Sequence, residues 1–263
     1  MRTMVVTLVG IALVSCIVTG QQAPVGYDDT PMQPNGRWRI HDGRRPQPKI
    51  VKPGAMSLAP APQDATVLVG ADEDRSAWQM MDGTPVTWPM NDGVLATGKG
   101  MIRTRAEFTD YQLHVEFATP KEVKGNSQER GNSGVFLNGT FEIQVLDSYQ
   151  NVTYPDGQAA AMYGQFPPMV NASRPPGEWQ AYDIVFRSPR FEAGGKLDRP
   201  AIVTVLHNGL LVHDATAFWG PTAHKRIDPY SPDNAKGPIA LQDHGNPVRY
   251  RNIWIRPIGR DDD

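Results

Sequence analysis

The fold is decided by the stretch GNSGVFLNGTFEIQVLDSYQN, residues 131–151. Within it, residues 141–146 read Phe-Glu-Ile-Gln-Val-Leu, so that apolar and polar side chains alternate. A period of two predicts a β-strand with one buried face and one polar face. The pair Asn138-Gly139 just before it is typical of a tight hairpin turn, and residues 134–137 are therefore expected to form the preceding strand.

Similar strand patterns continue along most of the chain. Asn208-Gly209 indicates a second hairpin, and residues 111–117 alternate as well as residues 141–146 do. The further expected strands are residues 66–69, 94–97, 183–186, 203–206, 210–213, 239–242 and 248–255. A short turn near residues 158–162 is the one place where helix is expected. About ten strands without alternating helices predict an all-β sandwich rather than a parallel sheet with crossover helices.

Length and composition divide the chain into regions. The 263 residues carry a formal net charge of -2 and show no basic stripe, so nucleic acid is not an expected partner. Residues 65–258 are long enough for one large β domain. Residues 21–64 are rich in proline and glycine and lack apolar periodicity, which predicts a mostly disordered tether. Residues 259–263 form an acidic tail that is expected to be solvated.

The N-terminal residues 1–20 have the pattern of an export signal. An apolar run over residues 5–14 follows Arg2, and it is too short to cross a bilayer comfortably. Leu13-Val14-Ser15-Cys16 resembles a bacterial lipobox, in which the cysteine is lipidated after cleavage. Cys16 is the one cysteine of the chain. We expect an exported protein with a lipid anchor in the membrane, and ordinary secretion with cleavage after Gly20 is the alternative.

Polar residues on the strand at 141–146 are the main candidates for chemistry. Glu142 and Gln144 lie roughly 6.5–7 Å apart on one face, within reach of one sugar-sized molecule. Asp147 has an odd offset and reaches that face only through a bulge or bend. The spacing resembles the E-x-D-x-x-E strand of jelly-roll glucanases, with an amide in place of the central acid. The alternative is a solvated strand face that ends in a turn at Asp147.

Further candidates lie elsewhere in the chain. His244, beside a glycine at a loop tip, suits proton transfer near neutral pH, although a structural turn is the alternative. Arg251 could hold a carboxylate such as Glu142 or Asp147, or an anionic intermediate. The remaining substrate-binding candidates are Tyr163, Trp179 and Asn132, and the two aromatic residues suit either sugar stacking or the core. No cofactor is evident, but Glu142, Asp147 and Asp243 could hold a divalent cation if they converge.

Several of these segments together resemble a known family. Residues 131–149, PGEWQAYDIVF at 176–186, His207-Asn208-Gly209, and GPIALQDHGNPVRYRNIWIRP at 237–257 are similar to the 3-keto-disaccharide hydrolase domain. The resemblance implies a concanavalin A-like jelly-roll sandwich. It also implies a hydrolase that cleaves glycosides already oxidised to a ketone at C3, so that the expected partner is a small oxidised glycoside.

The implied chemistry explains why a second strand acid is not needed. A C3 ketone acidifies the C2 hydrogen, and its removal allows the C1 substituent to leave by β-elimination. The resemblance suggests His244 or Asp147 as base, Gln144 and Arg251 as hydrogen-bonding groups, and Glu142 as acid or positioning group. The alternative from another class is a carbohydrate-binding sandwich of the cell envelope without catalysis, because fold does not decide function.

Overall fold

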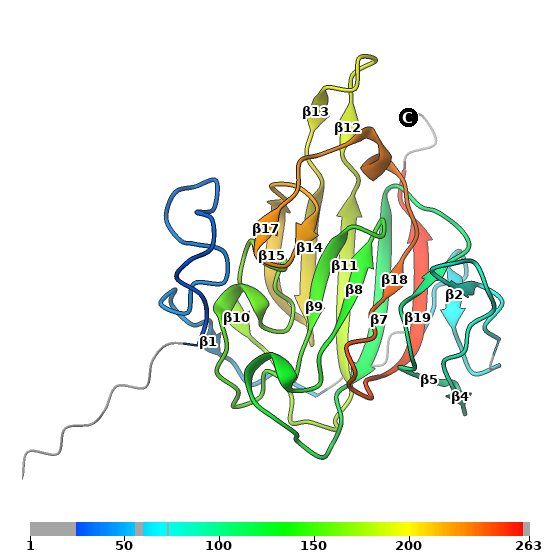
Figure 1. Ribbon diagram of the computed structural model, residues 1–263. Coiled ribbons are helices and arrows are strands. Elements are labelled where there is room, and N and C mark those ends of the chain that lie inside the picture. Colours follow the sequence, from blue (N-terminus) through cyan, green and yellow to red (C-terminus); the bar gives the residue numbers. More distant parts are fainter. Residues whose placement is uncertain (1–24, 56–59, 73, 260–263) are drawn as a thin grey trace, which may run out of the picture.

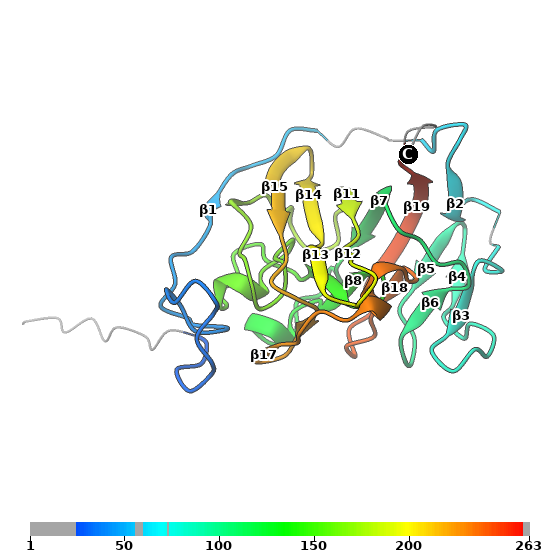
Figure 2. The same cartoon turned by 90° about the horizontal axis from the view of Figure 1, so that it is seen from above.

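The computed structural model describes residues 25–55, 60–72 and 74–259 as an all-β sandwich (Figure 1). The predicted export signal, Cys16 and the last four residues of the acidic tail lie outside the described residues. Two large sheets stack as separate layers, which Figure 2 shows from above. The all-β sandwich predicted from the strand pattern is therefore confirmed, and it has the concanavalin A-like jelly-roll form that the family resemblance implied.

The larger sheet has eight strands in the order β15-β14-β11-β7-β19-β5-β4, and β2 also pairs with β19. Its strands are β2 (Thr66–Val69), β4 (Met90–Asn91), β5 (Val94–Ala96), β7 (Tyr111–Ala118), β11 (Gln180–Arg187), β14 (Ile202–His207), β15 (Leu210–Ala217) and β19 (Arg249–Pro257). On β7, Leu113, Val115 and Phe117 face the core, as the alternation predicts.

The smaller sheet has five strands in the order β3-β6-β18-β8-β9. They are β3 (Trp78–Met80), β6 (Ile102–Thr104), β8 (Ser133–Leu137), β9 (Phe141–Val145) and β18 (Ala240–Leu241). Asn138, Gly139 and Thr140 join β8 to β9, and the first two have φ of 49° and 67°, the left-handed values that the central residues of such a tight turn require. The hairpin predicted from Asn138-Gly139 is therefore confirmed.

Short elements decorate the two sheets. Three two-stranded pairs join β1 (Lys49–Ile50) with β10 (Val170–Asn171), β12 (Arg190–Phe191) with β13 (Leu197–Arg199), and β16 (Thr222–Ala223) with β17 (Arg226–Ile227). The 3₁₀ turns are η1 (Ser127–Glu129), η2 (Pro155–Gly157) and η3 (Pro232–Ala235). The turn expected near residues 158–162 lies slightly earlier, at η2. In the part of the chain that the structure describes, no helix is long and apolar enough to cross a membrane.

The segment predicted as a disordered tether is ordered over residues 25–55. It packs at one end of the sandwich, where β1 pairs in parallel with β10 (Figure 1). Thr30, Gln33, Ile40 and His41 are buried there. The composition did not predict that this segment is ordered. Polar side-chain hydrogen bonds hold most of it in place, and such bonds leave no periodic apolar pattern in a sequence.

Candidate active site

Glu142 and Gln144 both point outward from β9, while Phe141, Ile143 and Val145 belong to the core. The register of the hairpin places Glu142 opposite Phe136 and Gln144 opposite Gly134 on β8. A side chain at Gly134 would collide with the Glu142 carboxyl group and the Phe136 ring. The glycine therefore leaves the space that Glu142 occupies.

Glu142 is a buried carboxyl group without a cationic partner. Glu142 is 5% exposed, and burial alone raises the pKa of its carboxyl group to about 8. Within the described residues, no lysine, arginine or histidine forms an ion pair with it. A buried carboxyl group in this state is protonated at neutral pH and can act as a general acid.

The Gln144 amide group connects Glu142 to the surrounding polar residues. One terminal atom of the amide lies 3.0 Å from Glu142 Oε1 and 2.9 Å from the Ser133 carbonyl oxygen. The other terminal atom lies 2.9 Å from Gln128 Oε1. With the amide turned so that its nitrogen faces Glu142, Gln144 donates both to Glu142 Oε1 and to the Ser133 carbonyl oxygen, and its own oxygen faces the Gln128 amide.

These residues line a pocket of about 440 Å³ on the outer face of the smaller sheet. Among the residues predicted for the site, the pocket brings together five: Asn132, Glu142, Gln144, Tyr163 and His244. Sequence reasoning missed Tyr27, Gln128, Phe136, Tyr154, Thr222, Ala223, His224 and Gln242 as lining residues. Phe136 on β8 and Gln242, which directly follows β18, could have been found, because they share the face of Glu142 on neighbouring segments of the sheet.

A chain of hydrogen bonds runs along one wall of the pocket. Tyr154 Oη lies 3.2 Å from Tyr163 Oη, which lies 3.1 Å from His224 Nδ1. Burial raises the pKa of both tyrosines well above their ordinary values, so both hydroxyl groups keep their protons. Burial and the neighbouring His41 and Lys225 lower the pKa of His224. The wall therefore presents neutral hydrogen-bonding groups.

Asp147 does not reach this pocket. It follows the end of β9, and its carboxylate accepts hydrogen bonds from Arg130, with Nε at 3.0 Å. Burial raises the pKa of Asp147, but the Arg130 guanidinium opposes that shift. An arginine-paired carboxylate is poorly suited to abstract a proton, so the suggested role of Asp147 as base finds no support in its position.

Arg251 and Trp179 lie on the other side of the sandwich, away from Glu142. Arg251 Nε donates to Glu116 Oε2 at 2.6 Å, and its guanidinium lies 4.1 Å from the centre of the Trp179 ring. The predicted pairing of Arg251 with Glu142 or Asp147 is therefore wrong. The reason is that β19 belongs to the larger sheet, and Arg251 extends from its outer face beside Glu116 on β7.

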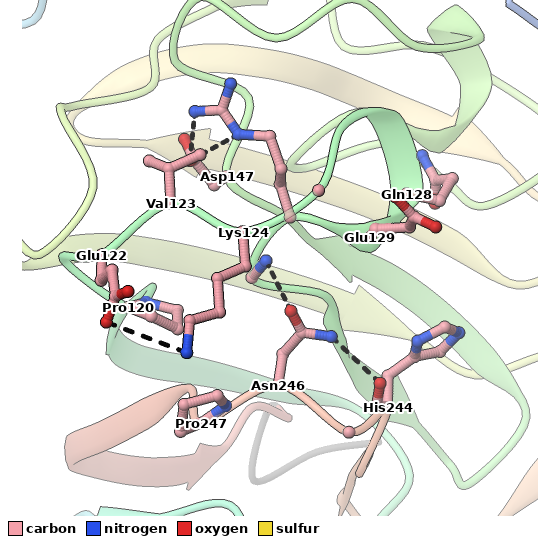
Figure 3. Close-up of a pocket in the computed structure, with 14 residues that line it drawn as sticks. Pro120, Glu122, Val123, Lys124, Gln128, Glu129, Asp147, His244, Asn246 and Pro247 are labelled. Atoms are coloured by element: carbon pink, nitrogen blue, oxygen red, sulfur yellow. Dashed lines mark hydrogen bonds and ion pairs between the residues drawn. The ribbon is translucent and has the colours of Figure 1, made fainter.

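A second pocket of about 690 Å³ adjoins the first, and the two share Gln128 and His244. Figure 3 shows these two residues on one side of it and Asp147 with Val123 on the other. Asn246 donates from Nδ2 to the His244 carbonyl oxygen at 3.0 Å, which fixes the backbone of this loop. The imidazole of His244 is exposed where the two pockets meet.

The acidic residues considered for a cation do not converge. Asp147 is held by Arg130, and Asp243 accepts hydrogen bonds from the backbone N–H groups of Gly100 and Gly245, both at 2.8 Å. Across the described residues, no group of three or more His, Cys, Asp or Glu side chains is placed to hold a metal ion.

Comparison with known proteins agrees with the fold. A candidate glycosyl hydrolase from Parabacteroides distasonis is 41% identical, with a TM-score of 0.73, and the match covers 81% of this chain and 93% of that one. A second candidate glycosyl hydrolase from the same organism is 18% identical, with a TM-score of 0.56 and coverage of 75% and 95%, and shows the fold alone. None of the curated proteins compared matches the chain. Residues 64–256 match the family described as the 3-keto-alpha-glucoside-1,2-lyase-like domain, and the chain belongs to that family.

Proposed function

We propose that the chain is a carbohydrate-processing enzyme that cleaves 3-keto-glycosides at the glycosidic bond. The observation that carries the proposal is Glu142, a buried carboxyl group with a pKa of about 8 in a polar pocket. The family to which the chain belongs and the similar candidate glycosyl hydrolase support a carbohydrate substrate. Strongly shifted carboxyl groups in pockets are frequent at catalytic sites.

The proposed reaction begins at C2 of the oxidised sugar. A base removes the C2 proton, and the electron pair of that bond forms an enolate with the C3 ketone. The enolate then re-forms the ketone while the bond from C1 to the glycosidic oxygen breaks, which leaves a C1–C2 double bond. Protonated Glu142 donates its proton to the departing oxygen. Addition of water, with its hydroxyl at C1 and its proton at C2, completes a net hydrolysis.

His244 is our candidate for the base. Its imidazole lies exposed at the junction of the two pockets, where it can reach a sugar bound beside Glu142. Tyr163, Gln144 and Asn132 supply hydrogen bonds to the sugar hydroxyl groups and to the enolate oxygen. Enolate stabilisation of this kind needs donors that hold their position, and the Tyr163 hydroxyl group is held by Tyr154 and His224.

The adjoining pocket of about 690 Å³ suits the substituent on C1. Ligand pockets of roughly 300–1,000 Å³ hold molecules of drug size, so the two connected pockets have room for a sugar and a second ring. Gln128 lies at the junction and accepts from Asn132 through its backbone oxygen at 2.7 Å. This arrangement supports a disaccharide or an aryl glycoside as the substrate class.

The test uses a 3-keto-glucoside in D₂O and follows the breaking of the C2–H bond and of the C1–O bond separately. Exchange of the C2 hydrogen reports the base, and release of the C1 substituent reports the acid. His244→Ala should lose both signals, whereas Glu142→Gln should keep C2 exchange and lose release. A substrate with a nitrophenol leaving group should restore release in Glu142→Gln, because nitrophenolate leaves without an acid. Tight binding of the sugar without turnover by the wild type would instead support a carbohydrate-binding module.

We also propose that the protein is exported and anchored in the membrane by a lipid on Cys16. The proposal rests on the lipobox pattern of residues 13–16 in the sequence. Fractionation of cells that produce the full chain or Cys16→Ala tests it. The variant should leave the membrane fraction, and unchanged membrane association would rule out the lipid anchor.

A further inference from the structure

The ordered N-terminal strap, residues 25–55, lies outside residues 64–256, which match the family, yet it reaches the pocket. Tyr27 lines the pocket beside His224, with the two ring centres 5.8 Å apart. Lys225 Nζ lies 3.5 Å from the centre of the Tyr27 ring, on a segment that also borders the site. A half-buried aromatic ring in the wall of a polar pocket is well suited to contact a sugar.

The strap is fixed to one particular loop, residues 153–165, which carries both tyrosines of the pocket wall. Gln33 Nε2 donates to the carbonyl oxygens of Gly164 and Gln165, both at 3.0 Å. Arg45 also donates to the Gln165 carbonyl oxygen at 3.0 Å. At the other end of the loop, Gln47 donates to the Thr153 carbonyl oxygen at 2.8 Å. These bonds fix the loop at both of its ends.

The centre of this contact is a fully buried pair, His41 and Asp156. His41 Nδ1 lies 3.2 Å from Asp156 Oδ1, and the His41 backbone N–H donates to Asp156 Oδ2 at 2.9 Å. The other ring nitrogen, Nε2, is buried and has no hydrogen-bond partner in the part of the chain that the structure describes. The pair thus fixes the plane of the imidazole ring.

The His41 ring packs directly on the wall of the pocket. Its centre lies 4.2 Å from the ring of Tyr154, 4.8 Å from that of Tyr163 and 5.4 Å from that of His224. These are the three residues of the hydrogen-bonded chain in the pocket. His41 is too deeply buried to touch a substrate, so it can act only through the rings that it contacts.

We propose that the strap is part of the active site, with Tyr27 as a residue that contacts the substrate and His41 as a positioning residue for Tyr154, Tyr163 and His224. The inference deepens the proposed function and rests on it for the kinetic tests. It predicts that the residues 64–256 alone do not make a complete site.

The test of His41 uses two substitutions that divide its contacts. Asn at position 41 keeps a donor near Asp156 and tolerates the left-handed φ of 60°, but it removes the ring. Phe keeps the ring and loses the donor. We expect His41→Asn to lower kcat at least tenfold with KM changed less than threefold. His41→Phe should keep most of the wild-type kcat. Equal rates in His41→Asn and the wild type, or equal losses in both variants, would overturn the positioning role.

The test of Tyr27 compares a substitution at this residue with a control substitution far from the pocket on the same strap. Tyr27→Ala should raise KM about tenfold with kcat within twofold, because a contact to bound sugar is lost. Ile50→Ala, at a residue 71% exposed on β1, should leave both constants unchanged. An unchanged KM in Tyr27→Ala would show that the tyrosine does not contact the substrate.

Hydrogen exchange separates this inference from the proposed function. Amides of residues 160–165 should exchange faster in His41→Asn than in the wild type, whether or not the substrate is the one proposed. An inactive wild type with this exchange difference would refute the proposed substrate and support the strap. An active wild type with unchanged exchange and unchanged kcat in His41→Asn would refute the strap alone.

Discussion

Glu116 and Glu142 are buried glutamates on opposite outer faces of the sandwich, and their surroundings differ in one respect. Burial would raise the pKa of Glu116, but the nearby His114, 3.6 Å away, and hydrogen bonds from Asn252 and Arg251 outweigh it and lower the pKa to about 2. Burial raises the pKa of Glu142 to about 8, and no cation opposes the shift. The same side chain at similar burial is thus a structural anion on one face and a protonated acid on the other.

This contrast favours the face of Glu142 over the face of Glu116 as the place for chemistry. Around Glu116, His114 has its pKa raised to about 9, because the hydrogen bond to Asp183 and the charge of the nearby Glu116 outweigh the effect of burial. Every charge there has a partner, as a structural network requires. Glu142 faces a pocket of about 440 Å³ and lacks such a partner, so its proton is available to a ligand.

Exchanging each glutamate for glutamine gives the largest contrast. Glu142→Gln should lower the release of a poor leaving group by about 10³-fold, because a general acid is lost. Glu116→Gln should change this rate less than fivefold in the folded protein, since Glu116 lies on the face away from the pocket. Initial rates with a 3-keto-disaccharide measure both. Comparable activity in the wild type and Glu142→Gln would show that Glu142 is no more a catalytic acid than Glu116 is.

The raised pKa of Glu142 predicts that the stability of the folded protein depends on pH. The folded-state pKa of Glu142, about 8, is above its unfolded value near 4.5, so the wild type loses stability as pH rises from about 4.5 to 8. Glu142→Gln lacks this loss and should exceed the wild type at pH 8 by on the order of 4 kcal/mol, with a smaller difference at pH 5. Urea unfolding at the two pH values measures it. A difference independent of pH would show that Glu142 is ionised in the folded protein.

Much of the contrast between the faces was visible in the sequence. The period of two over residues 141–145 fixed which side chains of β9 point outward, and Asn138-Gly139 fixed its pairing with β8. Glu142 and Gln144 were therefore predicted on one face, and the pocket joins them to His244, which was predicted separately from its place at a loop tip. Local pattern sufficed here because neighbours in one hairpin share a face by geometry.

The remaining site residues depend on contacts between distant segments. Tyr27 and His224 lie almost 200 residues apart in the sequence, and no local pattern places their rings at 5.8 Å. Arg251 was assigned to the wrong carboxylate because a strand pattern does not say which of two sheets the strand joins. Its partner Glu116 lies on β7, which the alternation predicted as a strand but could not place beside β19.

Removing the guanidinium that stabilises Glu116 should affect stability rather than catalysis. Arg251→Ala leaves a carboxylate that is 1% exposed without its closest cation, which costs about 2 kcal/mol when the discount for the partly exposed arginine is included. The activity per folded molecule should stay within twofold of the wild type. Chemical unfolding measures the loss of stability, and initial rates measure the activity. A large loss of activity at unchanged stability would mean that the outer face of the larger sheet takes part in the reaction.

The smallest effect is expected at Gly134, which gives Glu142 its space. Alanine there places a Cβ against the Glu142 carboxyl group and 2.9 Å from the Phe136 ring, so the carboxyl group must shift. Because the carboxyl group is the free end of a side chain, it can move, and we expect a loss of about tenfold in kcat, or about 1.4 kcal/mol. Gly194→Ala, where nothing lies within 4 Å of the added carbon, is the matched control and should keep the wild-type rate. A Gly134→Ala variant as active as this control would show that the acid does not need a fixed position.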